Sequence, residues 1–341
     1  MSFPQKVNDR QWVQDVSARL KTSRKQAGFL RYTAPLPDDQ RQWPFWSALY
    51  AMVYRWFDSE MAADELRSAT SKQPDSGPDV GLIRRSIGWN EQPPDSDLAA
   101  PPLLAVATVA VYHLTGDWNL IERVYPRLAA AHTWFDRQRD QDGDGLVEPA
   151  ALEETLRGNL SLPGDGQVTE RDWLELNYLR LADLDALAHI AYDLRLKDEQ
   201  QVWEARAETV RQALMPLSRE SDTPLSLFAR CAMPEQAEAV AASVQSAGPW
   251  GPPCVSPSGQ PCVSLIHNWL VYVGLRNYDL RPAANALAER SLLLVERSGY
   301  HALYHAETGE GMGAAPATVA ALAVDMLFRE RQTIAPGAHC I

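Results

Sequence analysis

The helical periodicity of apolar residues constrains the fold of this 341-residue chain more than any other feature. Residues 44–57 and 101–115 are apolar nearly all round, which is typical of helices buried on both sides. Residues 9–24 and 117–138 are apolar on one helical face and charged on the other, which is typical of helices that show one face to water. The two kinds of segment alternate along the chain, and this predicts an inner and an outer layer of helices.

The same period continues along the rest of the chain. It predicts further helices at residues 59–73, 170–194, 197–217, 233–247, 263–278, 281–298 and 314–330. Ser59 is the expected N-cap of the first of these. No convincing run of strands is found, so we predict one all-α domain over residues 1–341, a toroid of helical hairpins. The loops 139–169 and 248–262 would gather at its mouth, where a pocket is expected.

Charge and hydropathy exclude several classes of partner. The net charge is -12 and the 32 basic residues form no run, so nucleic acid and anionic membranes are not expected to bind. The apolar stretch 98–114 contains two prolines and is too short to span a bilayer. The first residues lack the apolar core of a signal peptide, so we expect a cytoplasmic protein. We also expect its partner to be a small-molecule substrate. Nothing in the composition argues against a homodimer.

The four cysteines do not form a disulfide framework at this chain length. Cys254 and Cys262 are close enough in sequence to bridge, although two reduced thiols are favoured in a protein without an export signal. No Cys/His nucleophile pattern and no glycine-rich phosphate loop are present. We therefore expect no cofactor.

The stretch "FDRQRDQDGDGLVEP" (135–149) superficially resembles a calcium loop, because Asp140, Asp142 and Asp144 alternate before a glycine. An EF-hand loop needs a glutamate at its twelfth position and a helix on both sides. Counting from Asp140, the twelfth position is Ala151. We therefore predict a polar turn that caps a helix and leads into the mouth loops, and no metal site.

Longer motifs carry a resemblance to a known family. The stretch "LTGDWNLIERVYPRLAAAHTWFDRQRDQDGDGLVEP" resembles the third hairpin of six-hairpin glycoside hydrolases of the mannosylglycerate and glucosylglycerate hydrolase type, relatives of trehalase. Other stretches resemble the family's motifs in the same order: "AAPPLLAVA", "LELNYLRLADLDALAHIAYDL", "GPWGPPCVSPSG", "HNWLVYVGLRNYDL" and "YHALYHAETGEGMGA". The resemblance spans residues 40–330 and implies an all-α (α/α)6 toroid.

The resemblance also implies two catalytic carboxylates, because inverting glycosidases use one as the acid and another to activate water. The family's general acid aligns with Asn159 and its general base with Ala302, and neither residue can transfer a proton in this way. Three further substrate-binding positions have lost a polar group or a ring. They are Trp46 in place of an aspartate, Ala100 in place of a glutamine and Ala317 in place of a tryptophan. A segment that covers the sugar in the family is largely missing. These changes favour a less polar ligand than a hexose, since each lost hydrogen-bond partner costs about 1–3 kcal/mol.

Other side chains are candidates for the lost chemistry. Around the 300–314 loop, where the family has its pocket, His305, Glu307 or His301 could act as acid or base beside Tyr304. Their spacing does not favour a metal, and an exposed polar loop is the alternative. Near the lost acid, the candidate carboxylates are Glu153, Glu154 and Asp165; solvated loop charges are the alternative. His267 is a candidate ligand contact or a core histidine, and Trp43, Trp46 and Trp89 are candidate lining residues or core residues.

Three functions follow as hypotheses. The first is a repurposed biosynthetic enzyme, of the cyclase, isomerase or lyase type, that acts on a largely apolar small molecule. The second is an inverting glycoside hydrolase with displaced carboxylates. The third is a binding protein that kept a pocket and lost its chemistry. The direction of the substitutions favours the first, and the resemblance itself favours the second.

Overall fold

The computed structural model describes residues 9–89, 96–159, 166–220, 223–255, 260–312 and 320–331. The chain divides into two compact units. The larger unit comprises Arg24–Ala34 and Asp38–Thr223, and the smaller unit comprises Met1–Ser23, Pro35–Pro37 and Pro224–Cys340.

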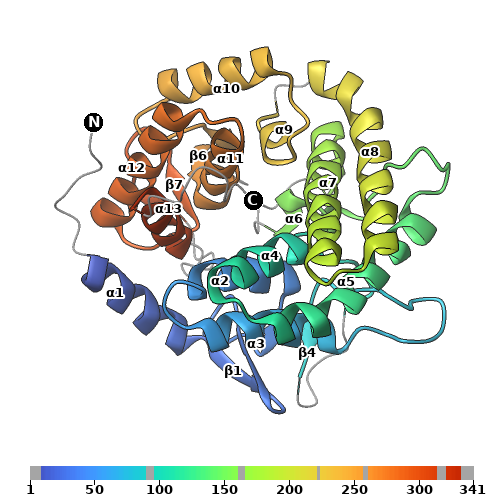
Figure 1. The fold of residues 1–341 in the computed structure, drawn as a ribbon. Helices are drawn as coiled ribbons and strands as arrows, with labels where there is room; N and C mark the ends of the chain where they lie inside the picture. The colour runs from blue at the N-terminus through green and yellow to red at the C-terminus, as the bar shows by residue number, and fades with distance from the viewer. Residues whose placement is uncertain are drawn as a thin grey trace. The chain divides into compact units, whose positions relative to one another are not determined.

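The larger unit is built from helical hairpins. Its helices are α2 (Pro44–Tyr54), α3 (Ser59–Ser71), α4 (Leu104–Thr115), α5 (Trp118–Arg139), the short α6 (Leu156–Asn159), α7 (Glu170–Asp193), α8 (Lys197–Glu220) and the 3-10 turn η1 (Leu152–Glu154). The pairs α2/α3, α4/α5 and α7/α8 are each in contact, and Figure 1 shows α7 and α8 running side by side. The longer helices coincide with the segments predicted from periodicity, whereas α6 and η1 lie in the stretch 139–169 that was predicted to be a loop.

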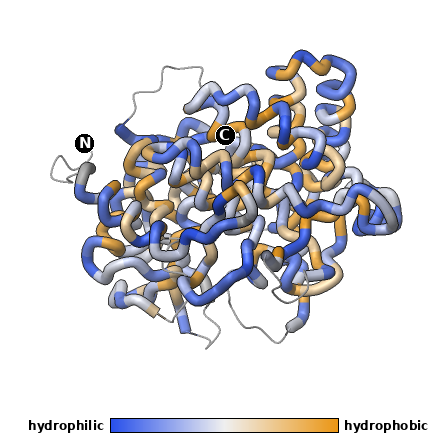
Figure 2. The backbone as a smooth tube through the Cα atoms, turned by 90° about the horizontal axis from the view of Figure 1, so that it is seen from below, coloured by the Kyte–Doolittle hydropathy of each residue, from blue (hydrophilic) through white to orange (hydrophobic). Residues whose placement is uncertain are grey.

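Burial follows the two kinds of helix that the sequence distinguishes. All residues of α2 are buried, as are the first eight of α4, from Leu104 to Val111. In α5 the buried residues are limited to one face. Figure 2 shows the corresponding mixture of hydrophobic and hydrophilic positions along the helices. Within the described ranges, no helix is both long enough and apolar enough to pass through a bilayer.

Local capping fixes where the helices begin and end. The N-cap of α3 is Asp58, whose carboxylate accepts a hydrogen bond from Met61 N, so the prediction of Ser59 was wrong by one residue. Asp58 also pairs with Arg24, which favours the carboxylate over a serine hydroxyl at this position. Helix α4 ends at Gly116, whose φ of +70° is readily adopted only by glycine.

The smaller unit combines helices with one small sheet. Its helices are α1 (Asp9–Thr22), α9 (Leu225–Phe228), α10 (Pro234–Ser246), α11 (Leu265–Asn277), α12 (Arg281–Ser298) and α13 (Leu322–Arg331). The sheet has four antiparallel strands in the order β5 (Cys254–Val255), β6 (Pro261–Ser264), β7 (Leu303–His305) and β8 (Gly311–Met312). It joins the loop before α11 to the loop after α12, and these loops contain parts of the stretches "GPWGPPCVSPSG" and "YHALYHAETGEGMGA" that resemble family motifs.

The expectation of no strands was wrong. The larger unit also contains strands, β1 (Arg24–Ala27) paired with β2 (Leu30–Thr33), and β3 (Arg41–Gln42) paired with β4 (Ile87–Gly88). Each strand is only two to four residues long, which is too short for a two-residue hydrophobic period to be recognised. These short strand pairs connect loop segments and do not form a layer of the fold.

One glycine makes a packing prediction in the smaller unit. A Cβ on Gly274 in α11 would lie 2.8 Å from Leu227 Cβ and 2.8 Å from Phe228 N, a close approach to backbone that cannot give way. We expect Gly274→Ala to lower the free energy of unfolding by about 1–3 kcal/mol, as overpacking does. Urea unfolding of the full chain measures this. Gly248→Ala is the matched control, because its Cβ would meet only Ala306 O at 3.8 Å, and an equal loss in both variants would contradict the packing argument.

Candidate active site

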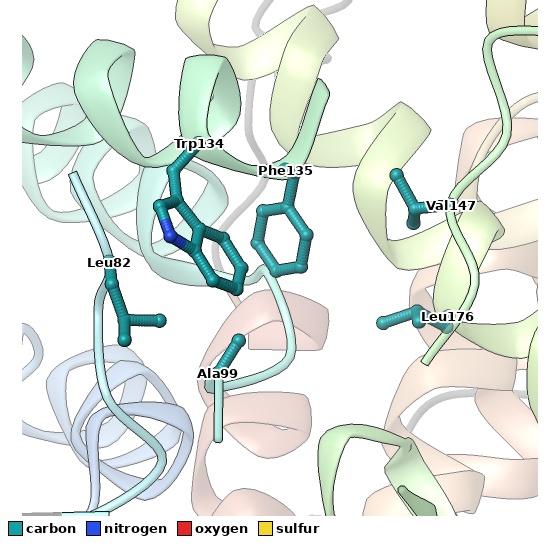
Figure 3. Packing of buried hydrophobic residues seen from close by; sticks show 6 residues of the cluster. All are labelled: Leu82, Ala99, Trp134, Phe135, Val147 and Leu176. Carbon is teal, nitrogen blue, oxygen red and sulfur yellow. The ribbon is translucent and has the colours of Figure 1, made fainter. Parts of the chain in front are cut away.

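The core of the larger unit supports the loop where the resemblance places the general acid. Trp134 and Phe135 of α5 pack edge to face with ring centroids 5.3 Å apart. Figure 3 shows them beside Ala99, with Val147 and Leu176 on the far side of Phe135. This cluster fixes Ala99, whose backbone N–H donates to the loop through Glu154.

We call residues 152–159, which form η1 and α6, the acid loop. Asn159 is buried, and its Nδ2 donates to Glu153 O at 2.8 Å and to Thr155 O at 2.9 Å. A Cβ on Gly158 would lie 2.1 Å from Leu152 O, so the loop closes tightly on itself. Asn159 therefore holds the loop together, and its predicted contact with substrate stays a prediction.

Glu154 has every sign of a structural carboxylate. Its side chain is 1% exposed. Oε1 accepts from Ala99 N at 2.8 Å and from Arg139 Nη2 at 2.7 Å, while Oε2 accepts from Ala150 N at 2.8 Å and from Arg139 Nε at 3.0 Å. Both oxygens of this carboxylate are occupied by a bidentate arginine and two backbone donors. The geometry favours a structural role for Glu154 over the predicted catalytic one.

Glu153 is the exposed carboxylate of the acid loop. The Arg85 guanidinium lies close enough to interact electrostatically with Glu153, and its Nη2 donates to Gly158 O at 3.2 Å. The same guanidinium stacks over Trp43, with Cζ 4.6 Å from the ring centroid. Burial lowers the pKa of Arg85, opposed by Glu153 and assisted by Arg41. Trp43, Arg85 and Glu153 thus come together beside Asn159.

The other predicted lining residues of the larger unit differ in exposure. Trp46 is 2% exposed and packs against Tyr50, which makes it a core residue and not a free sugar platform. Trp89 is half-buried, stacks on Tyr32, and donates through Nε1 to Gln42 Oε1 at 3.1 Å. Asp165 and Ala317 lie outside the described residues.

Ala100 lines a small cavity between α4 and α5. The cavity has a volume of about 20 Å³ and is almost wholly apolar apart from His132 and Asp183. His132 Nε2 lies 3.1 Å from Asp183 Oδ2, and among the described residues His132 Nδ1 has no hydrogen-bond partner. A cavity of this size holds about one water molecule. The side chain at position 100 therefore borders a water-sized space, and its predicted contact with substrate stays a prediction.

In the smaller unit, the 300–314 loop forms β7, β8 and the turn between them. Ala302 is buried, and Tyr304 is buried with its hydroxyl donating to Gly299 O at 2.8 Å. Burial raises the pKa of the Tyr304 phenol, so it titrates well above neutral pH. His301 lies edge-on to the Tyr304 ring at 5.8 Å. Tyr304 and His301 thus brace the loop.

His305 and Glu307 form the turn of the same loop. His305 Nδ1 accepts from Glu307 N and Thr308 N, each at 3.3 Å. Glu307 is exposed, so an acid or base role for it stays a prediction. His267 lies in the first turn of α11, where its backbone N–H donates to the N-cap Ser264 at 3.4 Å.

The structure also describes the strand pairing of Cys254 with Cys262 and the hydrogen bonds of the acidic turn. Cys254 and Cys262 lie directly opposite each other on β5 and β6, and Cys262 is buried. In the acidic turn, Asp140 Oδ1 accepts from Gly143 N at 2.9 Å, and Asp144 Oδ1 accepts from Leu146 N at 2.7 Å. These carboxylates cap backbone N–H groups, as the polar-turn interpretation expects.

Sequence reasoning missed two features of this region. Arg85 was overlooked, although "RRSIGW" places two arginines close to Trp89. Glu65 on α3 was overlooked because a glutamate on an amphipathic helix gives no sign of burial. It is fully buried, accepts from Ser47 Oγ at 2.7 Å, and burial raises its pKa to about 8 against opposing hydrogen bonds from Thr33 and Ser47.

Glu65 makes the stability of the protein depend on pH. Its folded pKa of about 8 lies above the ordinary value of 4.5, so between these values the folded state binds more protons than the unfolded chain. The contribution of Glu65 to the free energy of unfolding has its full value below about pH 4.5, and it is lost as the pH rises through about 8. Between pH 6 and pH 7.5 we expect the wild type to lose about 2 kcal/mol relative to Glu65→Gln. Denaturant titrations at both pH values measure this; parallel pH profiles would contradict it.

Comparisons with known proteins define the class to which this fold belongs. The chain superposes on the GH63 mannosylglycerate hydrolase from Thermus thermophilus in complex with glucose, with a TM-score of 0.77, 21% identity, and coverage of 93% of this chain and 100% of that chain. The same enzyme in complex with Tris and D-glycerate gives a TM-score of 0.76 at 20% identity, with the same coverage of both chains. A rhamnosidase from Klebsiella oxytoca with rhamnose bound gives 0.62 at 10% identity, over 96% of this chain and 66% of that one. These likenesses confirm the predicted all-α (α/α)6 fold class of the glycosidases.

The family follows from the sequence match. Residues 38–258 match the family described as the mannosylglycerate hydrolase MGH1-like glycoside hydrolase domain. The chain belongs to this family, and the resemblance seen in its motifs is confirmed.

Proposed function

We propose that this protein is a glycoside hydrolase that acts on a small glycoside and uses Glu153 as the displaced acid. The observation that carries the proposal is the position of Glu153. The Glu153 side chain is exposed. The backbone carbonyl of Glu153 accepts a hydrogen bond from Asn159, the residue that the motif resemblance aligns with the family's general acid. Family membership supports hydrolysis over the cyclase, isomerase or lyase hypothesis.

In this proposal the proton donor is Glu153, which belongs to the same acid loop as Asn159. In its protonated form the Glu153 carboxyl would give its proton to the glycosidic oxygen as the bond from that oxygen to the sugar breaks. Water adds to the sugar carbon from the opposite face, and the proton that this water loses passes to solvent. Asn159 cannot give that proton, because an amide stays neutral and retains its hydrogens.

The surroundings of Glu153 support an anionic group on the substrate. Arg85 lies beside Glu153, and Arg41 lies close enough to lower the pKa of Arg85. The Arg85 guanidinium, which lies over the Trp43 ring, can bind a carboxylate, because arginine recognises carboxylates through paired N–H groups. We therefore propose a glycoside whose leaving group carries a carboxylate.

Replacement of Arg85 tests the substrate class. We expect Arg85→Met to raise KM about tenfold for a carboxylate-bearing glycoside such as glucosylglycerate, because a charged hydrogen bond contributes about 1.5–3 kcal/mol. KM for the matching uncharged glucosylglycerol should change little. Arg123→Met, an exposed arginine on α5, is the control variant. Equal effects of Arg85→Met on both substrates would contradict carboxylate recognition and indicate a purely structural role.

A second function, sugar binding without turnover, is favoured by one observation. Asn159 and Ala302 stand at both catalytic positions of the family, and both are buried. A binder would show a dissociation constant for the glycoside and no release of free sugar. By contrast, the apolar-substrate hypothesis gains no support from the cavity at Ala100, which is too small for anything but water.

A further inference from the structure

Two histidines and an aspartate meet at one end of the larger unit, away from the acid loop. His113 lies in the last turn of α4, and His189 and Asp193 lie one turn apart in the last turns of α7. Their ligating atoms lie within 4.8 Å of one another. Asp172, which pairs with Arg157 of the acid loop, is at the other end of α7, about 30 Å away along the helix axis.

The distances between these atoms match the face of a tetrahedral metal site. His113 Nε2 and His189 Nε2 are 3.0 Å apart, and Asp193 Oδ2 lies 3.6 Å from the first and 3.7 Å from the second. Ligands at about 2.0–2.1 Å from a tetrahedral Zn²⁺ are separated from each other by about 3.3–3.4 Å. A cation at the centre of the triangle therefore needs only small side-chain adjustments.

The polar atoms of the cluster are poorly satisfied as they stand. Asp193 Oδ2 is shielded from solvent, and it lies 3.6 Å from His113 Nε2 and 3.7 Å from His189 Nε2, slightly beyond an ordinary hydrogen bond.

The surroundings also favour a cation. The cluster lies at the C-terminal ends of two helices, where the helix dipoles present their negative ends. Tyr112 and Tyr192 flank the two imidazoles, with ring centroids 5.7 and 6.4 Å away. The three side chains are between 21% and 33% exposed, so a fourth coordination position can be filled by water.

We propose that His113, His189 and Asp193 bind a transition-metal cation of the Zn²⁺ class. The ligand set of two imidazoles and one carboxylate suits zinc and disfavours Mg²⁺ and Ca²⁺, which require more oxygen ligands. The metal would join the ends of α4 and α7. Elsewhere these helices are already joined through Asp183 Oδ1, which accepts from Val106 N at 2.9 Å. This site is independent of the proposed hydrolysis.

Calorimetric titration of the EDTA-treated full chain with ZnCl₂ tests the proposal. We expect one Zn²⁺ per chain and at least a tenfold loss of affinity in His189→Ala and in Asp193→Asn. Asp198→Asn, an exposed carboxylate at the start of α8, should bind zinc like the wild type. Unchanged affinity in the two ligand variants would overturn the assignment.

A second measurement does not depend on the variants folding. Co²⁺ added to the wild-type protein should give the intense visible absorption of a tetrahedral site, and excess Zn²⁺ should abolish it. Weak octahedral bands, or a signal that millimolar Mg²⁺ removes, would overturn the proposal. Neither result depends on whether the protein hydrolyses glycosides.

Discussion

Glu154→Ala is expected to lower the free energy of unfolding by about 3–5 kcal/mol, the cost of removing one partner from a buried ion pair. The substitution leaves the Arg139 guanidinium, 17% exposed, without its carboxylate. It also removes the acceptor for Ala99 N and Ala150 N. Equilibrium unfolding in urea, followed by circular dichroism, measures the loss.

Two comparisons make this result specific. Glu122→Ala removes an exposed carboxylate from α5 and should change stability by no more than about 0.5 kcal/mol. Glu154→Gln keeps the shape and one acceptor, so its loss should be smaller than that of the alanine variant. If Glu154→Ala were as stable as the wild type but lacked activity, Glu154 would be catalytic and our structural assignment would be wrong.

Glu153→Gln is expected to reduce kcat for glycoside hydrolysis by about 10²–10⁴-fold, the usual contribution of a general acid. KM should change little, because the amide occupies the same space. Stability should also stay near that of the wild type, since Glu153 is exposed. Initial rates of sugar release over a range of substrate concentrations separate kcat from KM.

The control for this variant is Glu122→Gln, which makes the same chemical change on an exposed face of α5. A substrate with a better leaving group adds a sharper test. Because such a leaving group needs less protonation, the Glu153→Gln defect should shrink on it. A defect of equal size on both substrates would argue that Glu153 positions the substrate and does not donate the proton.

The sequence predicted the helices well because helical period and burial are local properties. Each predicted helical segment overlaps a helix of the structure, although α13 begins only at Leu322 and the first part of the predicted segment 314–330 lies outside the described residues. The short strands could not be predicted, because pairs such as Val263 with Tyr304 join residues far apart in the sequence. The N-cap of α3 is Asp58 and not Ser59, because the Asp58 carboxylate accepts from Met61 N; the same carboxylate also pairs with Arg24.

The candidate site was predicted less completely. The motif resemblance aligned Asn159 and Ala302 with the family's catalytic positions. The sequence could not show that the Glu154 carboxylate pairs with Arg139 while the Glu153 side chain remains exposed. The His113–His189 pair was also beyond sequence reasoning, because the two side chains meet only when α4 packs against α7. Because His113 and His189 are far apart in the sequence, the spacing of metal-ligand residue types along the chain could not reveal this cluster.

A time course of glucosylglycerate and mannosylglycerate by proton NMR, with the wild-type protein, tests the central claim most directly. We predict that free sugar accumulates in proportion to protein concentration, that the first anomer released is inverted, and that Glu153→Gln abolishes the release. Intact glycosides with line broadening from bound ligand would contradict hydrolysis and establish the binding protein instead. Intact glycosides without broadening would contradict both functions.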